Sequence, residues 1–289
     1  MMSIKRLSAA LGAELHGVNL AEPWHSALID GILQTFYEHQ VLVIPQQTLS
    51  PNRFVEFSRI FGRPQPHILS HLRFPEHPEI LYLSNVFKNG KPTGVYDGAA
   101  YWHTDMSYEA EPGSATMVYS LQAPAVGGET RFTNMYRAYE TLPEATQRCI
   151  DNLTVLHHYG NRQDLNENSR TSASPLTAEQ QQQVKNVFHP LVLRHPNTGR
   201  KALYAVSGSS FGIVGMVDAE ARTLLDELKE HATGTEFVYS HRYRVGDVVI
   251  WDNLSTMHSA TLIGPATGPE DTRLLYRISV KREPGIATP

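Results

Sequence analysis

Two histidines and one aspartate constrain the fold of this chain more than any other feature of the sequence. His103 and Asp105 are separated by one residue in the sequence Trp-His-Thr-Asp, and His258 follows much later, after the sequence Trp-Asp-Asn. Two imidazoles and a carboxylate on one face of a non-haem Fe(II) ion leave positions open for O₂ and a second ligand. A fold that uses this set must bring the first half and the end of the chain together.

The spacing of His103 and Asp105 suits a shared metal ion. Side chains on a strand alternate between its two faces, so both residues point to one side and Thr104 points to the other. The third ligand has to come from elsewhere, and His258, near the end of a β-rich segment, is the best candidate. Because the chain contains 14 histidines, a chance His-x-Asp pair without a metal is the alternative.

Short β-rich segments dominate the rest of the chain. Apolar and β-branched runs predict strands at residues 40–45, 79–87, 115–122, 153–157, 189–194, 201–206, 237–243, 247–251 and 273–281. Helices are expected at residues 51–61, with Ser50 as N-cap, at 134–151 with a break at Pro143, and at 218–231. Strands whose partners return late in the chain favour a mostly β fold with flanking helices, built on a double-stranded β-helix (jelly roll, cupin-like) core.

Residues 1–289 are expected to form a single domain, because the length suits one and no internal repeat is present. Residues 160–183 are polar and rich in Asn, Ser, Thr and Gln, which indicates an insertion between strands. This insertion fits either a solvated loop with a surface helix or an active-site lid. The sequence leaves both interpretations open.

Composition and charge exclude several classes of partner. A net charge of −4 and a pI of about 6.4 give no basic footprint for nucleic acid. No apolar run reaches the ~20 residues that a membrane span needs, and Glu14 interrupts the N-terminal apolar run. Cys149 is the only cysteine, which is compatible with a reducing compartment. We therefore expect a cytoplasmic protein and leave the formation of a homo-oligomer open.

The last predicted strand carries two arginines on one face. Arg273 and Arg277 alternate with the apolar residues Leu274, Tyr276 and Ile278. If the apolar face packs on helices, both guanidinium groups point inward, where burial is costly unless an anion pairs with them. The arginines therefore predict two anion-binding positions, and the alternative is that carboxylates from neighbouring strands pair with them.

A glycine pair precedes another polar candidate. Gly127-Gly128-Glu129-Thr130 indicates a tight turn that leads into a strand, and a simple hairpin turn is the plain interpretation. The functional alternative is that the Thr130 hydroxyl donates a hydrogen bond to the same carboxylate that Arg273 binds.

Together these residues resemble the taurine dioxygenase/TfdA family of Fe(II)- and 2-oxoglutarate-dependent oxygenases over nearly the whole chain. The marks, in chain order, are Trp102-His103-Thr104-Asp105, Gly127-Gly128-Glu129-Thr130, His195-Pro196 with Gly199-Arg200-Lys201, Gly246-Asp247, Trp251-Asp252-Asn253, His258, and the pair Arg273 and Arg277. Each mark alone is weak, and their common order and spacing make the resemblance specific.

The resemblance implies a jelly-roll fold and a set of site residues. His103, Asp105 and His258 would be the Fe(II) ligands. Thr130 and Arg273 would bind the distal carboxylate of 2-oxoglutarate, whose 2-oxo acid end chelates the iron. Because Asp105 is present, the related halogenases, which carry a small residue at this position, are disfavoured.

The resemblance also implies a substrate pocket. Arg277 matches the family position that can face the anionic group of the prime substrate. Other residues that could line this pocket, with ordinary packing as the alternative for each, are Asn85, Tyr108, His157, Tyr159 and Phe211.

The function expected from these residues is oxidative decarboxylation of 2-oxoglutarate to succinate and CO₂, with O₂ as co-substrate. It would be coupled to hydroxylation, or another oxidation, of a small anionic substrate such as a sulfonate, an aryloxyalkanoate or an amino acid. One alternative is a zinc-dependent hydrolase on the same ligands, which needs an activated water and no oxo acid site. Another is a non-catalytic jelly-roll binding module, which predicts weak iron binding and no turnover.

Overall fold

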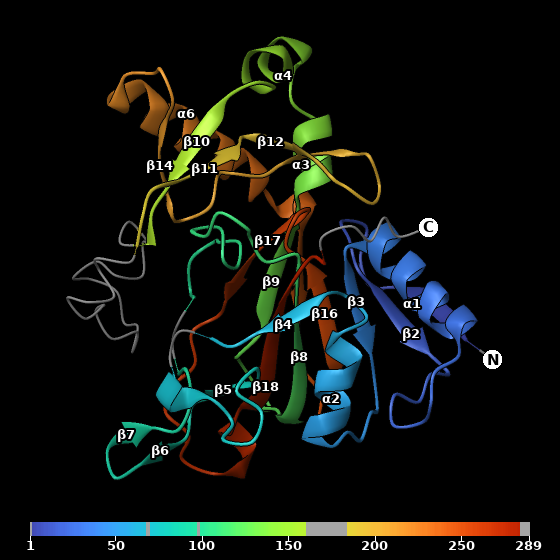
Figure 1. Cartoon of the computed structure of the whole chain (residues 1–289). Coiled ribbons are helices and arrows are strands. Elements are labelled where there is room, and N and C mark those ends of the chain that lie inside the picture. The colour runs from blue at the N-terminus through green and yellow to red at the C-terminus, as the bar shows by residue number, and fades with distance from the viewer. Residues whose placement is uncertain (1, 68–69, 97–98, 160–183, 284–289) are drawn as a thin grey trace.

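The computed structural model describes residues 2–67, 70–96, 99–159 and 184–283 (Figure 1). The predicted insertion at residues 160–183 lies outside the described residues. Within the described ranges the chain is mostly β with a few helices, as the sequence predicts.

A large sheet forms one wall of the molecule. Its strand order is β1 (Ser3–Arg6), β2 (Ala13–His16), β3 (Val41–Ile44), β16 (Val248–Asp252), β8 (Ala115–Gln122), β18 (Leu274–Lys281) and β4 (Arg63–Gln65), and β5 (Leu81–Ser84) also pairs with β18. All neighbours are antiparallel except β2 and β3. The sheet therefore places the last strand of the chain beside β8, which comes much earlier in the sequence.

A smaller antiparallel sheet holds β15 (Val238–His241), β9 (Thr130–Asn134) and β17 (Thr256–Ala260), with β9 in the middle. The remaining strands form short pairs and a triplet: β6 (Phe87–Lys88) with β7 (Lys91–Pro92), β12 (Val192–Arg194) with β13 (Lys201–Leu203), and β11 (Val187–Pro190), β10 (Thr154–His157) and β14 (Ser210–Ile213). The predicted strand at residues 79–87 is interrupted at Asn85, whose side chain bonds to the backbone of another loop.

The helices lie outside the two sheets (Figure 1). Their bounds are α1 (Ser26–His39), α2 (Pro51–Ser58), α3 (Met135–Glu140), α4 (Glu144–Ile150) and α6 (Asp218–Ala232), with 3₁₀ turns at Ser70–Leu72, Thr235–Phe237 and Pro269–Asp271. The predicted N-cap is confirmed, because the Ser50 side chain accepts a hydrogen bond from the Arg53 amide. The break at Pro143 is also confirmed, since it separates α3 from α4.

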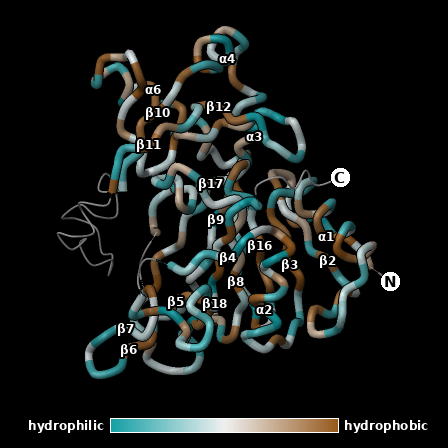
Figure 2. Tube along the Cα trace, viewed as in Figure 1, coloured by the Kyte–Doolittle hydropathy of each residue, from teal (hydrophilic) through white to brown (hydrophobic). Residues whose placement is uncertain are grey.

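Alternating side chains give the large sheet two apolar faces. On β16, Val248 and Ile250 belong to the core beneath α1 and α2, whereas Val249 and Trp251 belong to the core between the two sheets. Phe132 of β9 completes the inner core, with its ring centroid 5.4 Å from that of Trp251. Figure 2 shows the resulting hydrophobic colour along the central strands. Strands buried on both faces explain why the sequence shows continuous apolar runs there.

The structure also bears on membrane association. Within the described ranges, every helix is too short or too polar to cross a bilayer.

Replacing Phe132 by alanine should destabilise the fold strongly. The side chain is fully buried between the sheets, so the change should lower the free energy of unfolding by about 3–5 kcal/mol through the cavity that it leaves. Urea denaturation measures this change. Phe188→Ala is the matched control, because Phe188 is 57% exposed and its loss should cost less than about 0.5 kcal/mol. Similar losses in the two variants would contradict the inner-core assignment.

Candidate metal centre and cavity

A β-bridge joins the two histidines that the sequence sets far apart. The His103 amide donates to the His258 carbonyl at 3.0 Å, and the His258 amide donates to the His103 carbonyl at 2.9 Å. His258 lies on β17, so this bridge adds the segment around His103 to the edge of the small sheet. The two imidazole rings lie close together, tilted by 49° at a centroid separation of 4.1 Å.

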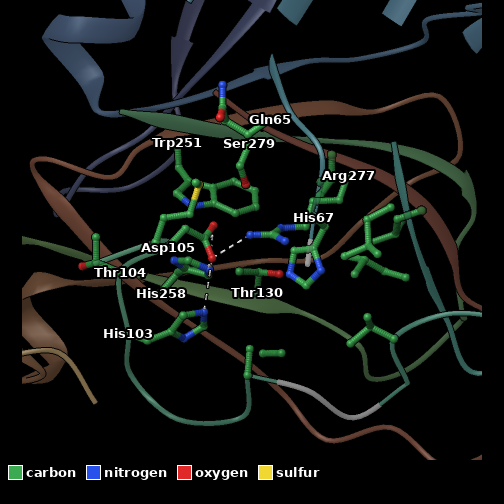
Figure 3. Close-up of a pocket in the computed structure, with 18 of the residues that line it drawn as sticks. Gln65, His67, His103, Thr104, Asp105, Thr130, Trp251, His258, Arg277 and Ser279 are labelled. Atoms are coloured by element: carbon green, nitrogen blue, oxygen red, sulfur yellow. Dashed lines mark ion pairs between the residues drawn. The ribbon is translucent and has the colours of Figure 1, made fainter. Parts of the chain in front are cut away.

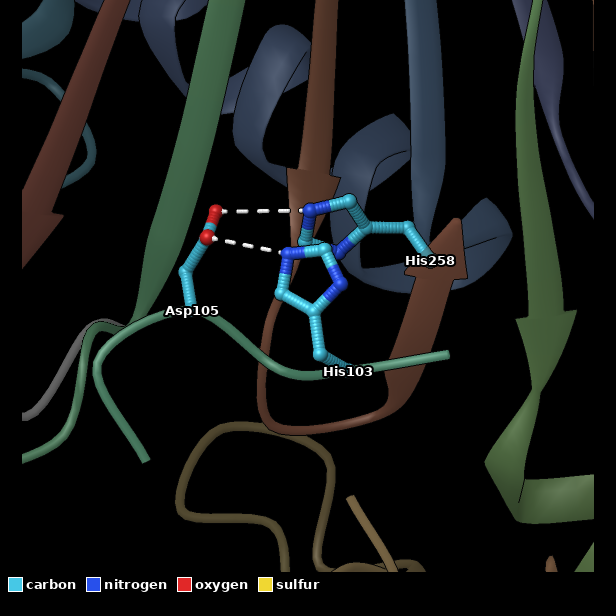
Figure 4. Close-up of side chains that lie close together, drawn as sticks. All are labelled: His103, Asp105 and His258. Carbon is cyan, nitrogen blue, oxygen red and sulfur yellow. Dashed lines mark ion pairs between the residues drawn. The ribbon is translucent and has the colours of Figure 1, made fainter. Parts of the chain in front are cut away.

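The three expected metal donors converge (Figure 4). The Nε2 atoms of His103 and His258 each lie 3.6 Å from a carboxylate oxygen of Asp105, and candidate donor atoms of all three residues lie within 4.8 Å of one another. The chain is not a strand beyond the bridge, because Asp105 begins a turn in which Met106 has a φ of 57°. His103 and Asp105 therefore point to the same side as predicted, but a turn rather than strand alternation orients the carboxylate.

The histidines are prepared to bind a metal through Nε2. The His103 Nδ1 atom lies 2.9 Å from the Tyr101 carbonyl, so a proton on Nδ1 is bonded there and leaves the Nε2 lone pair toward Asp105. Burial, together with neighbouring His103, holds the pKa of His258 well below its usual value. A neutral imidazole is the form that coordinates a metal.

Asp105 stays ionised although it is buried. Burial alone would raise its pKa, but the neighbouring groups together, with Arg277 the largest among them, outweigh this effect and hold the pKa well below its usual value. The Arg277 guanidinium lies 2.7 Å from Oδ1, and the Thr116 hydroxyl donates to Oδ2 at 2.7 Å. The carboxylate is therefore fixed in position by one contact on each oxygen.

Further hydrogen bonds fix the position of Thr116, which contacts Asp105. The Thr116 hydroxyl accepts from the Asn253 side-chain amide at 3.0 Å and lies 3.0 Å from the Ser279 hydroxyl. Asp252 accepts from the Leu254 amide and from the Ser255 hydroxyl in the turn that leads into β17. The Trp-Asp-Asn motif thus supports both Asp105 and the strand that carries His258.

The donor set fits a metal ion of the non-haem iron type. Donors that share an ion at about 2.1 Å lie about 3–3.5 Å apart, which is close to the observed separations. Two neutral imidazoles and one carboxylate on one side, with the opposite side toward a cavity, match the facial arrangement that leaves coordination positions open.

A second polar cluster lines the same cavity. Arg273 is 6% exposed, and its Nη2 donates to the Tyr96 carbonyl at 3.0 Å. Its Nε has no hydrogen-bond partner and no carboxylate lies within ion-pairing distance, among the residues that the structure describes. Thr130, at the start of β9, lines the same cavity. Arg273 is therefore a buried cation without a protein anion, whereas Arg277 has one.

The turn before Thr130 requires its glycines. Gly127 and Gly128 have φ values of 82° and 73°, a conformation that residues with a Cβ rarely adopt. A Cβ on Gly128 would lie 3.2 Å from Arg273 Cδ. The glycine thus allows the turn to pack directly against the Arg273 side chain.

The cavity is lined by both sheets and by the loops between them (Figure 3). Tyr108 lines it, and its ring packs edge-on against Tyr159 with centroids 4.7 Å apart. Asn85 is fully buried outside this lining. Its amide nitrogen donates to the carbonyls of Gly264 and Asp271, and its oxygen accepts from the Arg273 amide. In this position Asn85 fastens the loop that precedes β18.

Sequence reasoning missed several residues of the site. Thr116, Tyr243, Gln65 and His67 come from four separate segments, and all except Thr116 line the cavity. Thr116 lies on β8 and reaches Asp105 because the chain turns back at Asp105 before it enters that strand. Position on an inward strand face could have suggested Thr116, but nothing in the sequence distinguished the other three from ordinary polar residues.

Comparison with known proteins identifies similar chains. Residues 3–279 match the family model described as Taurine catabolism dioxygenase TauD, TfdA family. Pentalenolactone F synthase of Streptomyces arenae is 32% identical over 89% of this chain and 89% of its own. The alpha-ketoglutarate-dependent 2,4-dichlorophenoxyacetate dioxygenase of Cupriavidus pinatubonensis is 32% identical over 87% of this chain and 89% of its own. The solved structure of AAD-2 in complex with Mn(II) and N-oxalylglycine superposes with a TM-score of 0.80 at 27% identity and covers 100% of both chains.

Replacing Thr116 by valine should weaken metal binding without unfolding the protein. Valine keeps the volume but removes the hydroxyl that holds Asp105 Oδ2, so we expect the dissociation constant for Mn(II) to rise about 10- to 100-fold. Isothermal titration calorimetry measures this constant. Thr104→Val is the matched control, because within the described part of the chain the Thr104 hydroxyl bonds only to the Thr256 carbonyl. Equal affinity in both variants would show that Thr116 does not support the metal site.

Proposed function

Since this chain belongs to the Taurine catabolism dioxygenase TauD, TfdA family and is an Fe(II)- and 2-oxoglutarate-dependent dioxygenase, we propose that it oxidises a small anionic organic substrate in the cavity beside His103, Asp105 and His258. Family membership sets aside a zinc-dependent hydrolase and a non-catalytic binding module. The observation that carries the proposal is one cavity that contains both the three converging donors and the buried guanidinium of Arg273, which has no carboxylate partner among the described residues.

His103, Asp105 and His258 are the proposed iron ligands. When bound, Fe(II) supplies the redox chemistry by which 2-oxoglutarate and O₂ become succinate and CO₂, while one oxygen atom enters the substrate. The protein's contribution is position and charge: the bridge holds the two imidazoles, and Arg277 and Thr116 hold the carboxylate.

Arg273 and Thr130 are the proposed binding residues for the distal carboxylate of 2-oxoglutarate. A planar guanidinium matches a carboxylate with two parallel hydrogen bonds, and these are strong where water is excluded. The apolar side chains of Val118, Trp251 and Leu275 line the cavity here and exclude water. A buried cation of this kind is stable only if an anion offsets its desolvation, and the co-substrate supplies that anion.

The outer part of the cavity is the proposed substrate site. Arg277 and His67 lie side by side there (Figure 3). Tyr108 adds an aromatic side chain to the lining of the cavity. A guanidinium beside an imidazole suits a sulfonate or a carboxylate, as in sulfonates, aryloxyalkanoates and amino acids. We leave Asn85 out of the substrate contacts because its side chain is committed to backbone groups outside the cavity lining.

The proposal extends to the fold, the cellular location and the partners of the protein. We infer that the two sheets form a jelly roll and that residues 1–289 act as one domain, which the family match over residues 3–279 supports. We also propose a cytoplasmic enzyme whose partners are small molecules rather than nucleic acid or membranes, consistent with the net charge of −4.

Anaerobic addition of Fe(II) and 2-oxoglutarate to apo-protein should give a visible charge-transfer band, because the oxo acid chelates the ligated iron. His103→Ala should abolish the band and weaken Mn(II) binding. Arg273→Ala should keep Mn(II) binding but raise the dissociation constant for 2-oxoglutarate at least about thirtyfold, since a buried charge pair loses one partner. Absorbance titration measures both effects.

Arg200→Ala is the control for this experiment, because Arg200 pairs with Glu140 at the surface and should leave the titration unchanged. A normal band in His103→Ala would refute the ligand assignment. Unchanged 2-oxoglutarate affinity in Arg273→Ala would refute the co-substrate site alone.

Anionic compounds should stimulate succinate release more than their neutral counterparts. Matched pairs such as phenoxyacetate with phenoxyacetamide differ mainly in charge, and the charge-assisted contact should favour the anion about tenfold or more in kcat/KM. Succinate release, corrected for turnover without substrate, measures the preference. Equal or greater stimulation by the neutral members across the panel would contradict an anionic substrate.

A further inference from the structure

Tyr243 is a polar residue of the cavity to which no role has been given so far. It follows β15, is 5% exposed, and packs its ring in the core between the sheets. Its hydroxyl lies 2.8 Å from the hydroxyl of Thr130, and both residues line the cavity. The ring also packs edge-on against His241 at a centroid distance of 4.9 Å, so the phenol has a fixed position.

The protons of this hydroxyl pair can be counted. Thr130 and Tyr243 carry one hydroxyl proton each, and a single hydrogen bond between them uses one proton. The other proton has no acceptor among the side chains and backbone groups that the structure describes. The pair therefore presents one donor to the cavity.

The donor lies in a positively charged region. Tyr243 and Arg273 are close enough for each to influence the pKa of the other. A hydroxyl proton and a buried guanidinium that face the same space suit an anion and disfavour a neutral or cationic group.

The direction of the hydrogen bond follows from the chemistry of the two groups. A phenol is a stronger proton donor than an aliphatic alcohol, and the oxygen of the alcohol is the better acceptor. Burial raises the pKa of Tyr243 to about 12, so the phenol keeps its proton at neutral pH. The favoured arrangement is donation from Tyr243 to Thr130, which leaves the Thr130 proton for the ligand.

We propose that Tyr243 is a positioning residue that orients and polarises the Thr130 hydroxyl toward the distal carboxylate of 2-oxoglutarate, so that the pair selects a dicarboxylic over a monocarboxylic 2-oxo acid. This inference rests on the proposed roles of Thr130 and Arg273. It assigns Tyr243 a part in co-substrate selection that differs from simple filling of the core.

The test compares two co-substrates of similar length. 2-Oxoglutarate carries the distal carboxylate, and 2-oxopentanoate carries a methyl group in its place. In Tyr243→Phe, the dissociation constant of the Fe(II) protein for 2-oxoglutarate should rise about three- to tenfold through loss of one hydrogen bond. That for 2-oxopentanoate should not change. The charge-transfer band reports both, under anaerobic conditions.

A double variant tests the relay itself. Thr130→Val should weaken 2-oxoglutarate binding about tenfold or more, because it removes the hydrogen bond to the charged group. Adding Tyr243→Phe to Thr130→Val should then have no further effect. Tyr239→Phe is the matched control, because its hydroxyl bonds to His241 and lies outside the cavity lining.

Every outcome of these measurements either supports or overturns the proposed role of Tyr243. Phenylalanine keeps the ring that packs in the core, and Mn(II) affinity equal to that of the wild type verifies an intact site. Unchanged 2-oxoglutarate affinity in Tyr243→Phe, an equal loss for both oxo acids, or additive losses in the double variant would each overturn the relay. If Arg273→Ala weakens 2-oxoglutarate binding in the same series, the proposed co-substrate site survives such a result. If it does not, that site fails independently of Tyr243.

Discussion

The reciprocal backbone hydrogen bonds between His103 and His258 are the constraint on which the rest of the site depends. They join a loop that precedes β8 to a strand near the end of the chain, so the spacing of the two imidazoles is set by main-chain geometry. Side-chain hydrogen bonds then add Asp105 to this frame. Because the frame belongs to a sheet edge, the donors are held in place before any ion binds, and binding need not order them.

Charge balance explains why the two arginines of the last strand differ. Arg277 faces Asp105 and neutralises it, whereas Arg273 is buried and donates a hydrogen bond to the Tyr96 carbonyl. The sequence offered two outcomes for this pair, an anionic ligand or a protein carboxylate. The structure gives Arg277 a carboxylate of the protein and leaves Arg273 without one among the described residues. A single strand therefore carries one cation that holds Asp105 and also lines the proposed substrate site, and another that awaits the anionic co-substrate.

Alternation along β18 was the most reliable guide from sequence to site. Tyr276 and Ile278 pack toward the helices, so Leu275 and Arg277 line the cavity. Strand alternation also predicts that His103 and Asp105 point to the same side. They do so, but because the chain turns after the bridge and not because it continues as a strand. Asn85 is a candidate for the substrate pocket with ordinary packing as the alternative, and its buried amide fastens a loop to the Arg273 amide, as that alternative expects.

The sequence by itself determined the kinds of chemical group, the strand periodicity and the family, because these depend on residue identity and spacing. Only the tertiary structure decided which groups meet. Thr116 of β8 reaches Asp105 in the turn before that strand, and Tyr243 reaches Thr130 through the pairing of β15 with β9, in which His241 lies opposite Thr130. The second contact joins residues far apart in the chain, and local sequence patterns carry no information about the strand register that brings such residues together.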